Sequence, residues 1–191
     1  MAASQPIRNK EHARKLAKYF LERGQLRNYV LVVLGLNTAF RIGDLLGLLW
    51  DDVYDFDAEC ALPSITIVEQ KTQKPTTVAL NDSSLKALAK FAPGVAKPGR
   101  FLLESPRTGR AISRVQAYRL LRAAGEALKL PVRVTCHTLR KTLGYHAFKK
   151  GVSLAIIMEL FNHSSFGVTL RYIGITQEQK DEAFLDLDLI S

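Results

Sequence analysis

One apolar segment constrains the fold more than any other feature of the chain. Residues 26–40, LRNYVLVVLGLNTAF, are apolar on nearly every side of a helix. A helix with a single apolar stripe lies on a surface, whereas a helix that is apolar all round needs cover from every direction. The segment is shorter than the roughly 20 apolar residues that a membrane-spanning helix needs. We therefore predict a central buried helix around which the other elements pack.

Helix-cap residues and apolar spacing predict further helices on both sides of this segment. The predicted N-terminal caps are, in chain order, Asn9, a residue within 81–84, Ser113, either Thr135 or Cys136, Ser153 and Thr176. Residues 61–80 predict a β-hairpin, with a polar turn at 71–74 and Pro75 near the start of the second strand. We predict one domain over residues 1–191, mainly α with a small antiparallel β-sheet, which is an α+β fold.

The positive charge of the chain is concentrated in one region. The formal net charge is +9, and residues 97–150 hold thirteen Lys and Arg against Glu104 and Glu126. A basic field of this kind attracts polyanions, and nucleic acid is the usual one. A well-solvated basic surface is the alternative explanation. Charge alone therefore indicates a class of partner and no reaction.

Several common site motifs are missing from the chain. It has no GxxxxGK[ST] loop, no GxGxxG after a strand, no HExxH and no paired-cysteine zinc pattern. The acids at positions 51, 52, 55 and 57 crowd into one turn, which is typical of a solvated loop rather than a metal site. We expect no metal and no cofactor. Cys60 and Cys136 are expected to be reduced thiols, and no signal-peptide pattern opens the chain.

Three separate stretches are rich in residues that bind phosphate. TAFRIGDLLGLLW contains Arg41 and Asp44, CHTLRKT contains His137 and Arg140 on one helical face, and a third stretch, NHSSFGVTLRY, ends in a tyrosine. Each has an ordinary structural explanation when taken alone. They would be a helix ion pair, a solvated helix face and a core tyrosine.

Taken together and in this order, the stretches resemble the catalytic domain of the tyrosine recombinases, the family of phage integrases and Xer-type recombinases. The pattern is R-x-x-D-L, then K-T-x-K in a hairpin, then H-T-L-R, then N-H-S-S-x-x-x-T-L-R-Y. The resemblance runs from Arg8 to about Ile175. It implies the fold of that catalytic domain and an enzyme that cleaves and rejoins DNA strands through a 3′-phosphotyrosine intermediate, without a metal.

The resemblance also implies a role for each matching residue. Arg41 and Arg140 would bind the scissile phosphate, with Asp44 in support, and Tyr172 would be the nucleophile. His137 would act as the base near the phenol, and His163 would donate a hydrogen bond to the phosphate. The hairpin lysine, which protonates the leaving oxygen, would be Lys71, although Lys74 lies in the same turn. Two guanidinium groups can neutralise the charge of a pentacoordinate phosphate without a metal, so the chemistry agrees with the resemblance.

The implied partner is double-stranded DNA, bound by a monomer that assembles into a homo-oligomer, a tetramer, on the DNA. The expected DNA-binding side chains are Lys74, Arg114, Arg119, Arg122, Arg133 and Lys141. No membrane association is expected, and the protein would be cytoplasmic and associated with DNA. The acidic residues 176–191 carry an apolar pattern, and in relatives this segment docks on the neighbouring protomer.

Two features depart from the family pattern. Asn162 stands where the family usually has glycine before the histidine, so the turn there is expected to differ slightly. The N-terminal helical domain that closes a clamp around DNA in full-length relatives is expected to be absent from residues 1–191. Two other functions are considered as alternatives: a topoisomerase-like enzyme that nicks and reseals one strand, and a DNA-binding accessory protein without cleavage activity.

Overall fold

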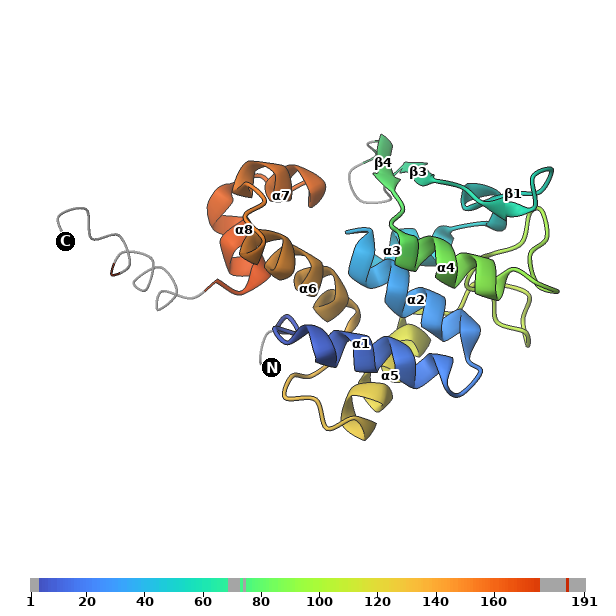
Figure 1. The fold of residues 1–191 in the computed structure, drawn as a ribbon, viewed down its shortest axis with the longest axis horizontal. Coiled ribbons are helices and arrows are strands. Elements are labelled where there is room, and N and C mark those ends of the chain that lie inside the picture. The colour runs from blue at the N-terminus through green and yellow to red at the C-terminus, as the bar shows by residue number, and fades with distance from the viewer. Residues whose placement is uncertain (1–3, 69–72, 74, 176–184, 186–191) are drawn as a thin grey trace.

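The fold is built around helix α2 (Leu26–Asn37) in a computed structural model that describes residues 4–68, 73, 75–175 and 185 (Figure 1). Helices α1, α4 and α6 all pack against α2. Val30, Val32 and Leu34 on this helix are fully buried. The prediction of a central buried helix is therefore confirmed.

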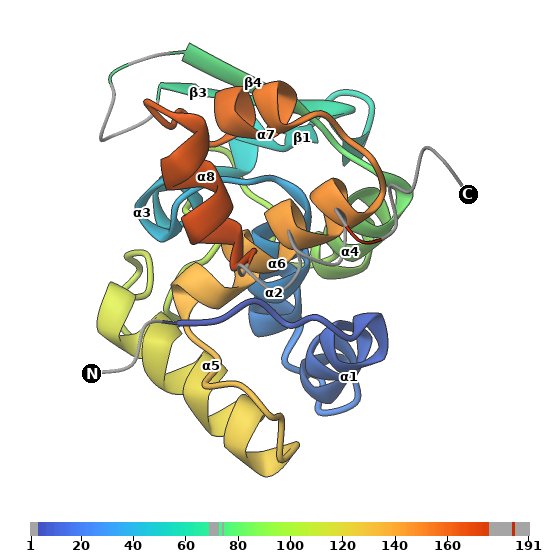
Figure 2. The same ribbon diagram turned by 90° about the vertical axis from the view of Figure 1, so that its left-hand side faces the viewer.

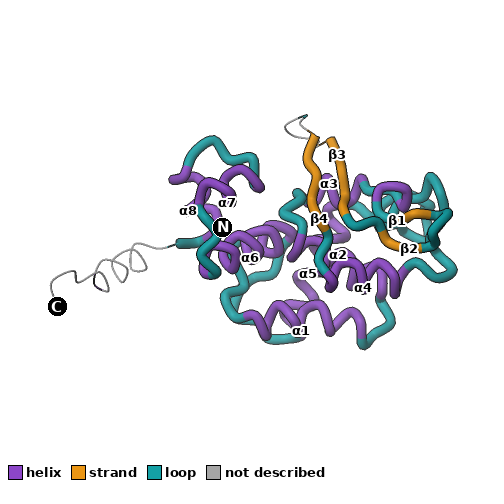
Figure 3. Tube along the Cα trace, turned by 45° about the horizontal axis from the view of Figure 1, so that its top comes forward, coloured by secondary structure: helices purple, strands orange, loops and turns teal. Residues whose placement is uncertain are grey.

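Most of the chain is helical, and the strands are short (Figure 3). The other helices are α1 (Lys10–Leu21), α3 (Ile42–Gly47), the 3-10 helix η1 (Trp50–Asp52), α4 (Asp82–Phe91), α5 (Arg114–Ala127), α6 (Cys136–Lys149), α7 (Leu154–Leu160) and α8 (Phe166–Ile173). The strands are β1 (Tyr54–Asp55), β2 (Cys60–Ala61), β3 (Ser64–Val68) and β4 (Pro75–Ala79). Within the described residues, no helix is both long and apolar enough to cross a bilayer.

The predicted caps form as the sequence indicates. The side chains of Asn9, Asn81, Ser113, Thr135 and Ser153 each accept a hydrogen bond from a backbone N–H in the first turn of the helix that follows. Each cap satisfies one of the N–H groups that the first helical turn leaves without a partner. The cap predicted at Thr176 lies outside the described residues.

The predicted hairpin is confirmed, but the structure also contains a second pair of strands. Strands β3 and β4 pair antiparallel, with Pro75 opposite Val68 at the end of the ladder next to the connecting turn. The pairing of β1 with β2 was not predicted from the sequence, and it makes a second two-stranded sheet. The acids of this region serve local turns, since Asp55 accepts hydrogen bonds from two backbone N–H groups and Asp52 accepts one from Leu49.

Helices α7 and α8 form a small unit beside α6, at the left of Figure 1, and Figure 2 shows the same pair from its own side. A separate apolar cluster holds the unit together, with Ile157, Phe161 and Ile173 at its centre. Gly144 of α6 lies against this cluster. A Cβ atom added there would come within 2.5 Å of Phe161 and 2.6 Å of Ile173.

The segment before α1 contacts both α6 and the end of α8. Ile7 is buried, its N–H donates to Thr142 Oγ1 at 2.9 Å, and its carbonyl oxygen lies 3.0 Å from His146 Nε2. The guanidinium of Arg8 donates to the carbonyl of Gly174, just after α8. This segment therefore bridges α6 and the C-terminal end of α8, the helix that carries Tyr172.

The close packing at Gly144 generates a stability prediction. We expect Gly144→Ala to lower the free energy of unfolding by about 1–3 kcal/mol, because the added methyl group has to displace two buried side chains. Urea denaturation followed by circular dichroism measures the change. Gly167→Ala in α8 is the matched control, since a Cβ at that position meets nothing within 4 Å. The control should be neutral or slightly stabilising, and an equal loss in both variants would contradict the packing argument.

Candidate active site

Two arginines from distant parts of the chain meet on one oxygen atom. Arg41, which precedes α3, donates from Nη2 to the carbonyl oxygen of Phe161 at 3.2 Å. Arg140, on α6, donates from Nη2 to the same oxygen at 2.9 Å. The two guanidinium groups therefore converge at a point just beyond the end of α7.

Each arginine makes a further hydrogen bond besides the one to the Phe161 oxygen. Arg140 is 5% exposed, and its Nε donates to the carbonyl of Ala39. The carboxylate of Asp44 accepts a hydrogen bond from the backbone N–H of Arg41 at 3.1 Å, which satisfies the start of α3. The predicted supporting position of Asp44 therefore corresponds to a helix cap in the structure.

Tyr172 lies on α8 with its ring packed among aromatic and cationic groups. The ring centroid is 4.9 Å from that of His163, 5.7 Å from Arg140 Cζ and 5.0 Å from Lys141 Nζ. The hydroxyl is buried and has no hydrogen-bond partner of good geometry among the described residues. Burial raises the pKa of Tyr172, and the charges of Arg140 and Arg41, with partial hydrogen bonding from Arg140, oppose this only in part. The phenol is therefore protonated in this state.

His163 follows a turn that needs an unusual backbone conformation. Asn162 has a φ of 49°, in the left-handed region that glycine adopts freely and asparagine tolerates best among the other residues. The departure from the family pattern at this position therefore still permits the left-handed turn. Beyond the turn, His163 Nδ1 lies 3.1 Å from Thr169 Oγ1.

His137 is near the start of α6, on the face that also carries Arg140 and Lys141. Its side chain is exposed at the surface, although the surrounding protein still withdraws the ring from water. Desolvation, followed by the charges of Arg140 and Lys141, lowers the pKa of His137 below its usual value. The imidazole is therefore suited to act as a neutral base.

The structure brings together five of the six predicted catalytic residues: Arg41, Arg140, His163 and Tyr172 through direct contacts, and His137 on the same face of α6 as Arg140. Lys71 and Lys74 lie outside the described residues. Sequence reasoning missed the ring contact of Lys141, which was expected only to bind DNA, and missed Thr169 altogether. Thr169 lies three residues before Tyr172, which places the two residues on the same face of the helix.

The predicted DNA-binding arginines of the α5 region have exposed side chains, and several are already engaged. Arg122 bonds Glu126 at 2.7 Å, and both Arg122 and Arg133 donate to the hydroxyl of Tyr118. These two hydrogen bonds lower the pKa of Tyr118. Arg122 and Arg133 are therefore connected through the hydroxyl of Tyr118. Tyr118 was not among the residues predicted from the sequence.

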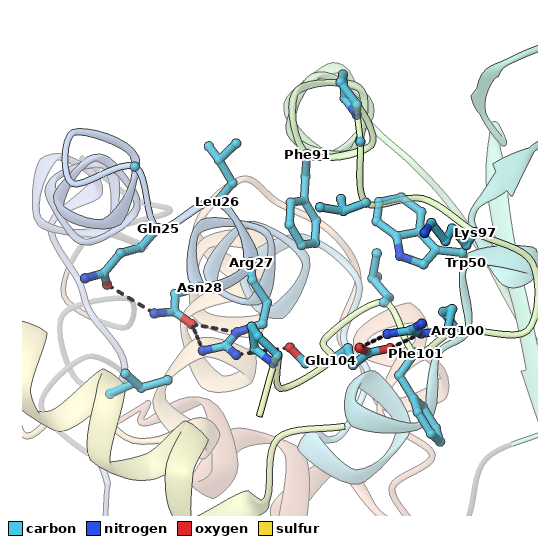
Figure 4. A pocket seen from close by; sticks show the side chains of 17 residues that line it. Gln25, Leu26, Arg27, Asn28, Trp50, Phe91, Lys97, Arg100, Phe101 and Glu104 are labelled. Carbon is cyan, nitrogen blue, oxygen red and sulfur yellow. Dashed lines mark hydrogen bonds and ion pairs between the residues drawn. The ribbon is translucent and has the colours of Figure 1, made fainter. Parts of the chain in front are cut away.

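A large cavity, of about 860 Å³, lies apart from these groups, between the start of α2 and the loop after α4 (Figure 4). Trp50, Phe91 and Phe101 line it, and its polar side chains bond one another. Arg27 donates to Asn28, for example, and Arg100 pairs with Glu104. None of the five predicted catalytic residues that the structure describes lines this cavity, so we place the candidate active site at the Phe161 oxygen instead.

The side chains gathered at α6, α7 and α8 indicate which chemistry the site can perform. Two convergent guanidinium groups can bind one anionic tetrahedral group bidentately, and they remain charged at any physiological pH. A phenol and two imidazoles lie beside them. Such a site can bind a phosphate ester, offer it an oxygen nucleophile and exchange protons, all with side chains of the chain itself.

Comparison with known proteins shows what this chain is similar to. Residues 9–179 match the phage integrase family. The probable integrase/recombinase YoeC of Bacillus subtilis is 36% identical over 180 residues, which is 94% of each chain. The tyrosine recombinase XerD of Corynebacterium glutamicum is 27% identical over 83% of this chain and 52% of its own length. The present chain therefore spans nearly all of YoeC but only about half of that XerD.

Solved structures share the fold at low sequence identity. The crystal structure of XerA recombinase aligns with a TM-score of 0.76 at 20% identity, covering 96% of this chain and 66% of that chain. A lambda integrase dimer bound to a core site aligns with a TM-score of 0.68 at 17% identity, covering 92% of this chain and 62% of that chain. The predicted mainly α fold with small antiparallel sheets is therefore confirmed as the catalytic-domain fold of these proteins.

The opposite pKa shifts of two tyrosines generate a prediction. Tyr118 should ionise before Tyr172 as pH rises, because two arginines hydrogen-bond the Tyr118 hydroxyl and lower its pKa, whereas burial raises the pKa of Tyr172. Phenolate absorbance recorded during an alkaline titration measures both steps. Tyr118→Phe should remove the early step and Tyr172→Phe should remove a late one. Loss of the early step in Tyr172→Phe would mean that Tyr172 is not buried.

Proposed function

Since the chain belongs to the phage integrase family, the tyrosine recombinases, we propose that it cleaves and rejoins strands of double-stranded DNA through a covalent 3′-phosphotyrosine intermediate. The observation that carries the proposal is the convergence of Arg41 and Arg140 on a single oxygen beside the ring of Tyr172. The proposed role is that of a site-specific recombinase or integrase.

We propose that the scissile phosphate takes the place of the Phe161 carbonyl between the two guanidinium groups. That carbonyl oxygen already accepts a hydrogen bond from each arginine, so a non-bridging phosphate oxygen would meet the same donors. The attacked phosphate gains negative charge in its pentacoordinate state. A preorganised donor aimed at developing charge contributes about 3–4 kcal/mol to lowering a barrier, which makes the arginine pair the largest proposed catalytic contribution.

The remaining residues would move protons. Tyr172 attacks phosphorus and forms the phosphotyrosine ester, while the bond from phosphorus to the 5′-oxygen breaks. His137 accepts the phenol proton, because its lowered pKa keeps it neutral and able to act as a base. Lys71 donates the proton that the departing 5′-oxygen needs, and His163 contacts the phosphate. No metal is required in this scheme.

We propose that DNA is held mainly through its phosphates by the exposed basic residues that follow the hairpin. Candidates from the described residues are the exposed Arg114, Arg119, Arg122 and Arg133, together with the half-buried Lys141. Phosphate contacts position a protein on DNA and carry no sequence information directly. We further propose that the protein is a monomer when free and a tetramer on its DNA site, and that it works in the cytoplasm, where such DNA is found.

Covalent trapping tests the function itself. A suicide duplex that loses the 5′ end after cleavage should accumulate a 3′-phosphotyrosyl adduct with the wild-type protein, visible as a shifted band in a denaturing gel. Tyr172→Phe should abolish the adduct and leave DNA binding intact, because only the nucleophilic oxygen is removed. Tyr118→Phe, which changes a half-buried tyrosine on α5, is the matched control. An adduct that persists in Tyr172→Phe would overturn the assignment of the nucleophile.

Leaving-group chemistry tests the hairpin lysine. We expect Lys71→Ala to cut the cleavage rate by about 10²–10⁴-fold, the usual contribution of a general acid. A substrate with sulfur in place of the 5′-bridging oxygen should restore most of the rate, because a thiolate leaves without a proton. Lys74→Ala serves as the paired comparison. Rescue of Lys74→Ala and not of Lys71→Ala would move the general-acid role to Lys74.

A further inference from the structure

A buried threonine connects α8 to His163. Thr169 is fully buried, one turn after the cap Ser165. Its Oγ1 lies 3.2 Å from the backbone carbonyl of Ser165 and 3.1 Å from Nδ1 of His163. The hydroxyl therefore has two partners on opposite sides, one in its own helix and one in the turn that precedes it.

The direction of these two hydrogen bonds follows from counting protons. A hydroxyl group has a single hydrogen, and a carbonyl oxygen can only accept. The Thr169 hydrogen is therefore given to Ser165, and the lone pairs of Oγ1 face the imidazole. Nδ1 of His163 then has to carry a hydrogen and donate it to Thr169. The neutral ring consequently has no hydrogen on Nε2.

We propose that Thr169 is a positioning residue that fixes His163 in the Nδ1–H tautomer. The consequence for catalysis rests on the proposed function, which brings a phosphate to this site. A neutral His163 in this tautomer offers the phosphate only the lone pair of Nε2, which repels an anionic oxygen. It becomes a donor to phosphate only as the imidazolium ion, when Nε2 is also protonated. His163 therefore binds the scissile phosphate in its charged form.

The groups around His163 make this protonation dependent on DNA. Tyr172 of α8 stacks edge-on against the imidazole, and Arg140 and Lys141 of α6 lie against the same tyrosine ring. Arg41 and Arg140 meet at the carbonyl of Phe161, whose ring centroid is 5.3 Å from that of His163. These cations disfavour a further positive charge, whereas a bound phosphodiester favours one. The bound scissile phosphate thus favours the imidazolium form of His163, which is the form that can bind it.

The tautomer can be measured directly, without cleavage activity. Long-range ¹H–¹⁵N correlation spectra of histidine-labelled protein, recorded without DNA at a pH where imidazoles are neutral, distinguish the two tautomers. Wild type and Thr169→Ser should show the Nδ1–H pattern for His163. Thr169→Val removes the acceptor but keeps the shape of the side chain, so it should show the Nε2–H pattern that free histidine prefers. An Nε2–H pattern in the wild type would overturn the proposal.

A matched control separates the tautomer from a general loss of a buried hydroxyl. Thr38 is also buried, and its Oγ1 donates to the carbonyl of Leu34, four residues earlier in the chain, at 2.8 Å. Thr38→Val therefore removes the same kind of helix contact as Thr169→Val. The control should leave the His163 pattern unchanged. An equal change in both variants would overturn the direct link between Thr169 and His163.

The pH dependence of cleavage tests the consequence. Single-turnover cleavage by Thr169→Val should be about 10–100-fold slower than wild type at low pH, the usual effect of removing a residue that orients an active-site group. The ratio of the two rates should fall as pH rises, because only the variant keeps a proton on Nε2 when His163 is neutral. Thr169→Ser should restore wild-type behaviour. A ratio that stays constant with pH would mean a purely structural role and would overturn the proposal.

The two kinds of readout keep this inference distinct from the proposed function. If no covalent adduct forms with any duplex, the proposed function fails while the spectra still report the tautomer. If the adduct forms through Tyr172 but the wild type shows Nε2–H, the function stands and the role of Thr169 is wrong.

Discussion

The carbonyl oxygen of Phe161 is the point on which this site depends. It receives Arg41 from the junction of α2 and α3, and Arg140 from the middle of α6, so one atom joins three distant parts of the chain. The oxygen is available because Phe161 ends α7, and a carbonyl in the last turn of a helix has no partner within that helix. The end of a short helix thus gathers one buried and one half-buried charge, and pairing with well-placed acceptors makes the burial of Arg140 tolerable.

The same arrangement explains why the small α7–α8 unit lies where it does. Its own apolar cluster is limited to a few side chains around Ile157, Phe161 and Ile173, and Gly144 allows that cluster to approach α6 closely. Apolar packing has little directional preference. The hydrogen bonds from Arg41 and Arg140 to the Phe161 oxygen fix the orientation of the unit. The proposed catalytic side chains of α6 and α8 are therefore positioned by an interface between two packed units rather than within one core.

Much of this could be predicted from sequence because the signals were local. The buried central helix followed from an apolar segment, the caps followed from Asn9, Ser113 and Thr135, and the β3–β4 hairpin followed from alternation around a polar turn. The β1–β2 pair was missed because two-residue strands carry no period. The contacts of Lys141 and Thr169 were missed because they depend on how α6 and α8 meet, and no local pattern encodes that meeting.

The state described here also explains how the proposed nucleophile can be both sheltered and available. Among the described residues the buried hydroxyl of Tyr172 has no hydrogen-bond partner of good geometry, and a buried hydroxyl that is poorly satisfied costs about 1–3 kcal/mol. The ring is held instead by contacts with His163, Arg140 and Lys141, each cation–π contact contributing about 0.5–2 kcal/mol. A phosphate that draws the two cations toward itself weakens these ring contacts, and it offers the hydroxyl a polar environment. Binding of the anion therefore lowers the cost of exposing the phenol, and no separate mechanism is needed to release it.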